Sequence, residues 1–254
     1  MELDPKNALA YARRGEIYRA AGQLQKAVDD CAKAIELDPK SAFAYANRGA
    51  ACGALGQFQR AVEDSSKAIG LEPKYAYAYS ILGEAYRMLG QQQKAIDNYS
   101  RAIELDPKNA AWYVSRGMVY SEEEQWQKAV EDGSKAIELD PNQALGYIVR
   151  GGAYGQLGQS QKAVDDGSKA ITLDPTNPLS YTLRGIAYAS LGQDDKAIGD
   201  CSKSIELAPQ NAHLYDCRAE VYEKLGRHDE AAKDRAKAKE LGDAKARAAM
   251  PPVK

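Results

Sequence analysis

Two histidines and four cysteines are the residues of this chain with the greatest potential for catalysis or metal binding. A general base, a reactive thiol or a zinc ion needs several such groups at converging positions. His213 and His228 share no metal-ligand spacing with the cysteines, which are Cys31, Cys52, Cys201 and Cys217. We therefore predict no metal and no cofactor. The histidines are expected to be surface or packing residues, and the cysteines to be reduced, half-buried packing residues.

Other patterns that could indicate an active site have simpler interpretations. Residues 151–158 read GGAYGQLG, but a phosphate-binding loop would end in Gly-Lys-Ser/Thr and follow a strand. Carboxylates such as Asp29 and Glu36 stand near Lys33, which is typical of a solvated helix face. The sequence predicts no catalytic residue and no enzyme.

Composition excludes several classes of partner. Charged residues make up 28% of the chain and the net charge is −2, so no basic surface for nucleic acid or anionic lipid is expected. No apolar run approaches the roughly 18 residues that span a bilayer, and the N-terminal residues lack the apolar core of a signal peptide. Four cysteines do not form a disulfide framework in a chain of this size. The predicted setting is cytoplasmic.

The elements that carry these residues repeat along the chain. A proline returns every 34 residues, at Pro5, Pro39, Pro73, Pro107, Pro141, Pro175 and Pro209. A tyrosine returns at the same interval, at Tyr11, Tyr45, Tyr79, Tyr113, Tyr147, Tyr181 and Tyr215. Self-similarity at a fixed period of about 20 to 50 residues is typical of repeat architectures.

Each copy predicts two helices. In the first copy Tyr11, Arg14 and Tyr18 fall on one helical face, which predicts a first helix, helix A, over about Ala8–Ala21. A second helix, helix B, is predicted over about Leu24–Leu37. A glycine separates the two helices, and proline ends helix B because it disfavours helical geometry in the preceding residue.

The tyrosine, glycine, alanine and proline positions of these copies strongly resemble those of the tetratricopeptide repeat family, whose unit is a helix–turn–helix of this length. The resemblance covers about residues 8–242, as seven units. It implies an all-α fold, a right-handed superhelical solenoid of antiparallel helix–turn–helix repeats. It also implies that helix A lines a concave face that holds extended peptides or partner helices.

The predicted division has seven repeats between two end segments. The repeats are residues 8–41, 42–75, 76–109, 110–143, 144–177, 178–211 and 212–242. Residues 1–7 match the end of a repeat, which suggests a fragment of a longer array or an array cut at a repeat boundary, natural or engineered. Residues 243–254 are expected to form a capping helix, Ala244–Met250, and a tail, because Gly242 and Asp243 replace the usual Asp-Pro.

Six repeats depart from the family pattern in the same way. Helix A carries an arginine before its small residue, at Arg14, Arg48, Arg116, Arg150, Arg184 and Arg218. Helix B carries an aspartate, at Asp30, Asp64, Asp132, Asp166, Asp200 and Asp234. The third repeat has Leu82, Asn98 and Tyr99 instead. We interpret the change as an ion pair between the helices, because a guanidinium can meet a carboxylate through two hydrogen bonds. The alternative is an arginine that extends to solvent and an exposed aspartate.

The inward side of helix A is the expected binding surface. The resemblance implies these peptide-binding residues: Arg13, Asn47, Ile81, Glu84, Val114, Met118, Ile148, Val149, Leu183 and Ile186. Most of those in the middle and late repeats are apolar, and exposed apolar patches often mark binding sites. The alternative is that these side chains pack within the array.

The sequence therefore predicts a non-catalytic protein–protein interaction scaffold that binds a peptide or a partner helix in the groove. The alternative function is a self-assembling structural element that stacks head to tail through its N-terminal end. The fold alone does not identify the partner.

Overall fold

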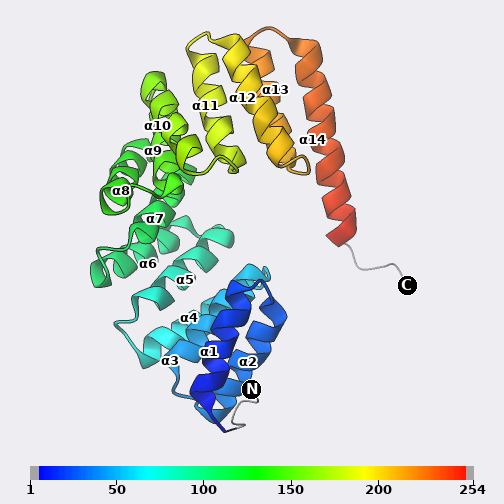
Figure 1. The fold of residues 1–254 in the computed structure, drawn as a ribbon. Helices are drawn as coiled ribbons and strands as arrows, with labels where there is room; N and C mark the ends of the chain where they lie inside the picture. The colour runs from blue at the N-terminus through cyan, green and yellow to red at the C-terminus, as the bar shows by residue number, and fades with distance from the viewer. Residues whose placement is uncertain (1–5, 250–254) are drawn as a thin grey trace. The chain divides into compact units, whose positions relative to one another are not determined.

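The computed structural model describes residues 6–249, and their side chains as far as Gly242. All regular elements of this part are α-helices, joined in sequence as antiparallel pairs (Figure 1). They are α1 (Ala8–Ala20), α2 (Leu24–Leu37), α3 (Ala42–Ala54), α4 (Phe58–Leu71), α5 (Ala76–Met88), α6 (Gln92–Leu105), α7 (Ala110–Glu122), α8 (Trp126–Leu139), α9 (Ala144–Gln156), α10 (Ser160–Leu173), α11 (Pro178–Ser190), α12 (Asp194–Leu207), α13 (Ala212–Lys224) and α14 (His228–Ala249). The predicted all-α repeat fold is confirmed, with each odd-numbered helix as a helix A.

The chain forms two compact units, Met1–Glu123 and Glu124–Lys254. Within each unit a helix A packs against the helix B that follows it, and each helix B packs against the next helix A. Neighbouring helices A also contact one another, as α1 and α3 do in the first unit and α11 and α13 do in the second. Helices A therefore adjoin along one face of each unit.

Capping residues set where the helices begin and end. The Asn7 side chain accepts a hydrogen bond from the Ala10 amide at the start of α1, as an N-cap residue does. After most helices A a glycine adopts a left-handed conformation, as at Gly22 with φ 73°. Glu124 takes this position in the fourth repeat with φ 56°, a conformation that is costly for a residue with a Cβ.

Small residues let helices A and B approach closely. A Cβ added at Gly15 would lie 2.6 Å from the Cys31 Sγ and 3.2 Å from the Ala27 carbonyl oxygen. Real Cβ atoms essentially never come within 3.0 Å of such atoms, and 3.2 Å is tighter than most of their contacts. Helices α1 and α2 therefore approach closely at Gly15 and Ala27.

An arginine on helix A meets an aspartate on helix B in five repeats. In the fifth repeat the Arg150 Nε and Nη2 donate to the two Asp166 carboxylate oxygens at 2.9 and 2.7 Å. Asp166 is 5% exposed, and the Arg150 side chain is 23% exposed. The same two-bond geometry joins Arg14 to Asp30, Arg48 to Asp64, Arg184 to Asp200, and Arg218 to Asp234.

The arginines also contact groups beyond their aspartates. The Arg150 guanidinium carbon lies 5.8 Å from the ring centroids of both Tyr147 and Tyr154, within the range of cation–π attraction. The Arg184 Nη1 donates to the Ser168 hydroxyl on the preceding helix B at 3.3 Å. Arg184 thus touches its own helix pair and the repeat before it, as Arg218 does through the Ser202 hydroxyl.

The third repeat differs from this arrangement. In the third, Leu82 is buried, and the Tyr99 hydroxyl donates to the Glu84 carboxylate at 2.7 Å. This bond joins α5 to α6 in place of an ion pair. In the fourth, Arg116 belongs to the first unit and Asp132 to the second; their pairing stays a prediction.

The C-terminal end corrects one expectation. A separate helix over Ala244–Met250 was expected after a break at Gly242, but α14 runs without interruption from His228 to Ala249. No proline stands here to end the helix, and the alanine, lysine and arginine residues that follow are strong helix formers. Residues 1–5 and 250–254, which include most of the proposed N-terminal remnant and the tail, lie outside the described part.

The Arg150–Asp166 pair yields a prediction about stability. Arg150→Leu leaves the Asp166 carboxylate buried without a cation and should lower the free energy of unfolding by about 3–5 kcal/mol. Asp166→Asn leaves a guanidinium that reaches solvent and should cost about 1–3 kcal/mol. The double variant carries an uncharged pair, like Leu82 and Asn98 in the third repeat, and should cost less than the sum.

Denaturant unfolding followed by circular dichroism measures these free energies. The control is Lys203→Gln with Glu206→Gln, an exposed pair in the same unit, whose removal should change stability by less than about 1 kcal/mol. Strictly additive losses at Arg150 and Asp166 would contradict the interpretation as a coupled pair.

Candidate functional site

The structure brings one cysteine and one histidine together. The Cys217 Sγ lies 3.4 Å from the His213 Nε2 on α13. A nucleophilic thiol needs a lowered pKa, but burial raises the pKa of Cys217 to about 11. His228 lies elsewhere, with its Nδ1 2.6 Å from a Glu223 carboxylate oxygen. These contacts form no reactive thiol.

The other cysteines are equally unreactive in character. All four are buried and free of disulfides, so the expectation that they are half-buried is corrected. Burial raises the pKa of Cys31 and of Cys201 to about 12. Cys31 packs beneath Gly15 of helix A, and Cys201 packs beneath Gly185. At these positions the volume of the side chain matters more than the reactivity of its thiol.

Among the described residues, no group of three or more His, Cys, Asp or Glu side chains could hold a metal ion. No helix of the described part is long and apolar enough to cross a membrane.

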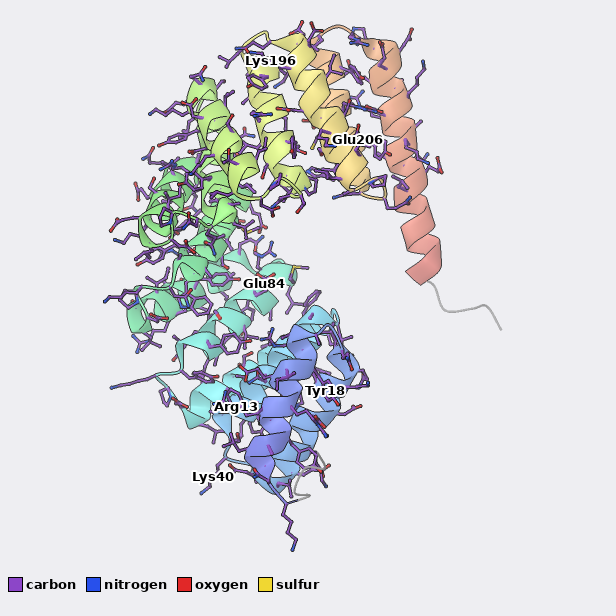
Figure 2. All side chains as sticks on the ribbon, viewed as in Figure 1. Arg13, Tyr18, Lys40, Glu84, Lys196 and Glu206 are labelled. Carbon is purple, nitrogen blue, oxygen red and sulfur yellow. The ribbon has the colours of Figure 1, made fainter. Side chains whose placement is uncertain are left out.

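The residues predicted to line a groove fall into three classes of exposure. Exposed are Arg13, Glu84 and Met118; half-buried are Ile148, Leu183 and Ile186; buried are Asn47, Ile81, Val114 and Val149. The Asn47 amide donates to the Phe43 carbonyl within α3. Arg13 and Glu84 lie on α1 and α5 of the first unit (Figure 2).

This distribution corrects part of the predicted groove. Asn47, Val114 and Val149 are too deeply buried to contact a ligand. Leu183 packs against the buried cluster around Val164, and Ile186 packs against the cluster around Cys201 and Val221. These apolar side chains are largely used for packing between helices, which was the alternative interpretation.

A cavity opens instead in the first unit, among the second, third and fourth repeats. Its volume is about 560 Å³, within the range of ligand pockets. We call it the repeat 3 pocket. It is lined by Ala50, Gly53, Ala54, Gly56, Phe58, Ala61, Ser80, Ile81, Glu84, Ala85, Met88, Tyr99, Trp112 and Ser115.

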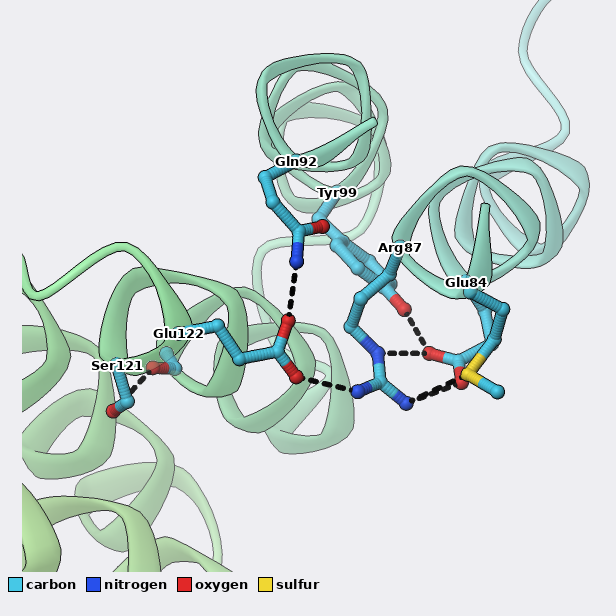
Figure 3. Close-up of polar contacts among 8 residues, drawn as sticks. Glu84, Arg87, Gln92, Tyr99, Ser121 and Glu122 are labelled. Atoms are coloured by element: carbon cyan, nitrogen blue, oxygen red, sulfur yellow. Dashed lines mark hydrogen bonds and ion pairs between the residues drawn. The ribbon is translucent and has the colours of Figure 1, made fainter. Parts of the chain in front are cut away.

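A hydrogen-bonded network stands beside the repeat 3 pocket (Figure 3). The Arg87 Nε and Nη2 donate to the two Glu84 oxygens at 3.0 and 2.6 Å. The Arg87 Nη1 donates to Glu122 at 2.6 Å, and the Gln92 amide donates to the other Glu122 oxygen at 2.8 Å. Together with the Tyr99 hydroxyl, these bonds connect α5, α6 and α7.

The network holds Glu84 in its ionised form. Burial acts to raise the pKa of Glu84, but hydrogen bonds from Arg87 and Tyr99 outweigh it and leave this pKa below its usual value. Burial and the adjacent Glu84 carboxylate raise the pKa of the Tyr99 phenol, which keeps its proton. The arrangement can bind and orient a ligand, because it combines apolar walls with one fixed carboxylate.

Sequence reasoning selected Ile81 and Glu84 but missed most of this pocket. Trp112 gave the clearest available signal, because its equivalents one repeat away in each direction are Ala78 and Gly146. Tyr99 departs from the pattern of the other repeats, but the departure by itself indicates only a different link between the two helices. Ala50 and Gly53 are small where the next repeat carries Glu84 and Arg87, a difference that indicates open space only once the structure is known.

Models of the tetratricopeptide repeat match several parts of the chain. Those described as "Tetratricopeptide repeat" match residues 8–41, 31–63, 145–177 and 168–199. One described as "TPR repeat" matches residues 83–123. No curated protein sequence matches the chain significantly.

Solved structures with the same helical-repeat fold are numerous. The crystal structure of MamA is 31% identical, with a TM-score of 0.51; the match covers 65% of this chain and 97% of MamA. A tetratricopeptide repeat protein from Parabacteroides merdae is 19% identical, with a TM-score of 0.73 and coverage of 92% and 93%. YrrB, described as having an unusual peptide-binding site, is 24% identical, with a TM-score of 0.56 and coverage of 70% and 92%. The last two likenesses show the fold alone.

The raised thiol pKa values predict slow alkylation. At pH 8 a thiol with a pKa near 12 is about 0.01% ionised, against about a quarter for an exposed thiol. Iodoacetamide should therefore modify Cys31 and Cys201 of the folded protein at least about 1000-fold more slowly than after denaturation. Mass spectrometry of peptides from a time course measures both rates, and a fast-reacting thiol in the folded chain would contradict the result.

Proposed function

The chain belongs to the tetratricopeptide repeat family, and on this premise we propose that it is a non-catalytic protein–protein interaction scaffold that binds a peptide segment. The binding surface is the face formed by helices A. The observation that carries the proposal is the repeat 3 pocket, which opens among helices A of the first unit and is lined mainly by apolar side chains. A partner helix that presents one apolar side chain to this pocket fits the same proposal.

The chemistry of the rest of the chain supports this function. The cysteines have raised pKa values, and the described residues contain no group of three or more metal-binding side chains. Exposed residues on other parts of helices A, such as Arg13 and Met118, offer polar and apolar groups to a ligand. YrrB, which shares the fold, is described as having a peptide-binding site.

Selection from a phage-displayed library of random 12-residue peptides on the full chain tests this function. We expect enriched peptides whose affinity, measured by isothermal titration calorimetry, falls at least about tenfold in a variant of the helix A face. The variants are Arg13→Glu and Met118→Glu, and Lys67→Glu on the exposed side of α4 is the control. Failure to enrich any peptide, or equal losses in the control, would contradict the proposal.

A second candidate function, self-assembly, is favoured by α1. Ile17 is 64% exposed, whereas its equivalents in the other six repeats are buried: Ala51, Ala85, Val119, Ala153, Ala187 and Val221. Leu9, two turns away on α1, is also exposed. We propose that this α1 face, defined by Leu9 and Ile17, pairs with the α1 face of a second copy.

The head-to-tail stacking that the sequence suggested as an alternative would also need an apolar surface on α14, and α14 matches this need less well. Arg235 and Lys239 stand on α14 where other repeats carry small or apolar residues. At the equivalent Gly133, an added Cβ would lie 2.8 Å from the Cβ of Arg150 on the next repeat. An arginine at this position would therefore keep a following repeat further away.

Light scattering across a wide range of concentration tests self-assembly. Dimers that form in the unmodified chain should be lost in Ile17→Lys and kept in Leu145→Lys, which alters an exposed leucine elsewhere. A monomer at every concentration would remove self-assembly as a candidate. Continued growth beyond a dimer would show head-to-tail stacking instead.

A further inference from the structure

The repeat 3 pocket exists because small residues replace large ones on α3. Ala50 stands where the next two repeats carry Glu84 and Met118, and Gly53 stands where the next repeat carries Arg87. Ala54 likewise stands where the next repeat carries Met88. The side chains that cover this position elsewhere are absent from α3, and the space above it is open.

Two large side chains, Tyr99 and Trp112, form the wall of the pocket that is contributed by α6 and α7. Tyr99 occupies a position that is Gly133 and Gly167 in the following repeats, and Trp112 occupies one that is otherwise small in its neighbours. At these glycines the next helix A approaches within 2.8–2.9 Å of an added Cβ. A tyrosine there must keep the next helix further away, and α6 and α7 do pack less closely than α8 and α9 or α10 and α11. The pocket is thus built by residues that break the repeat.

The charge of the pocket is negative. Among its lining residues Glu84 is the charged one, and half of its side chain is exposed. Arg87 is shared between Glu84 and Glu122, so two carboxylates meet one guanidinium and one negative charge remains. Burial of 80% of the Arg87 side chain leaves this cation little access to a ligand.

We propose that the repeat 3 pocket takes a bulky apolar side chain of a protein ligand together with an adjacent arginine or lysine. The apolar side chain lies against Phe58, Ile81 and Trp112, which line the pocket. The cation of the neighbouring residue pairs with Glu84, because a carboxylate with surplus negative charge favours it. The aliphatic part of the basic side chain covers the apolar wall. This inference rests on the proposed function and names the ligand chemistry of the same site.

Four synthetic peptides test the proposal on the full chain. The probe is acetyl-Gly-Phe-Arg-Gly-amide, and its relatives replace arginine by neutral citrulline, arginine by glutamate, or phenylalanine by glycine. The chain has two tryptophans, so Trp126→Phe leaves Trp112 as a fluorescent reporter inside the pocket. Phenylalanine occupies the position of Trp126 in the second repeat, as Phe58.

We expect a saturable change in Trp112 fluorescence with the Phe-Arg peptide. Citrulline should weaken binding about threefold to tenfold, since a half-exposed ion pair is lost, and glutamate or glycine should weaken it further. Glu84→Gln should remove the preference for arginine over citrulline without abolishing binding. Retention of that preference in Glu84→Gln would overturn the assignment of Glu84.

A matched pair of variants locates the binding. Ala50→Met fills the pocket with the residue that the fourth repeat carries there, as Met118, and should weaken binding at least about tenfold. Gly152→Met makes the same change in the fifth repeat, where an added Cβ meets nothing within 4 Å, and should have no effect. Equal binding by both variants would overturn the inference.

The outcomes separate this inference from the proposed function. If library-selected peptides bind the helix A face but are insensitive to Ala50→Met, the scaffold function stands and the pocket assignment falls. If neither the library nor the Phe-Arg peptide yields binding, both fall.

Discussion

A carboxylate buried between two helices requires a cation within hydrogen-bonding distance, and this requirement organises most of the repeats. Asp166 is met by Arg150 from the same helical pair. The arginine in turn needs space, which the flanking tyrosines border and the glycine of the preceding helix B provides, as Gly133 does for Arg150. One ion pair therefore constrains the spacing within a repeat and between repeats. The net contribution of the pair to the stability of the fold is modest, because the cost of desolvating the two charges opposes their attraction. Its geometry is nevertheless specific.

The third repeat is released from this constraint and carries the pocket. Its link between helices is a hydrogen bond from Tyr99 to Glu84, which leaves the carboxylate half exposed. A buried Arg–Asp pair satisfies its own charges, whereas Glu84 remains available on the helix A face. Loss of the regular pair and the appearance of a candidate binding group thus have the same physical origin.

The sequence predicted the fold well because its signals are local. The period of 34 residues and the helical spacing around Tyr11 sufficed to place α1 and α2 nearly to the residue. The helix break predicted at Gly242 was wrong, because a glycine without a following proline does not end a helix whose next residues are strong helix formers. Burial of individual residues was harder to predict: Val114 and Val149 were selected as apolar groove residues but are buried between helices. The repeat 3 pocket depends on Ala50, Tyr99 and Trp112 together. Each departs from its equivalents in other repeats, but the three belong to different repeats and none alone indicates a pocket.

The Arg150–Asp166 pair and the glycine of its helix B make the fifth repeat a module that can be duplicated. Gly167 accepts Arg184 as Gly133 accepts Arg150, so an additional copy of the fifth repeat would meet the same kind of neighbour on both sides, whereas the sixth repeat carries Cys201 at this position. Duplication of the whole fifth repeat can lengthen the array here and keep the same kinds of contact between neighbouring repeats. The third repeat lacks that freedom, since Tyr99 excludes the close approach that a standard neighbour makes. Growth of the array can lengthen the scaffold while the position of its pocket within the first unit stays constant.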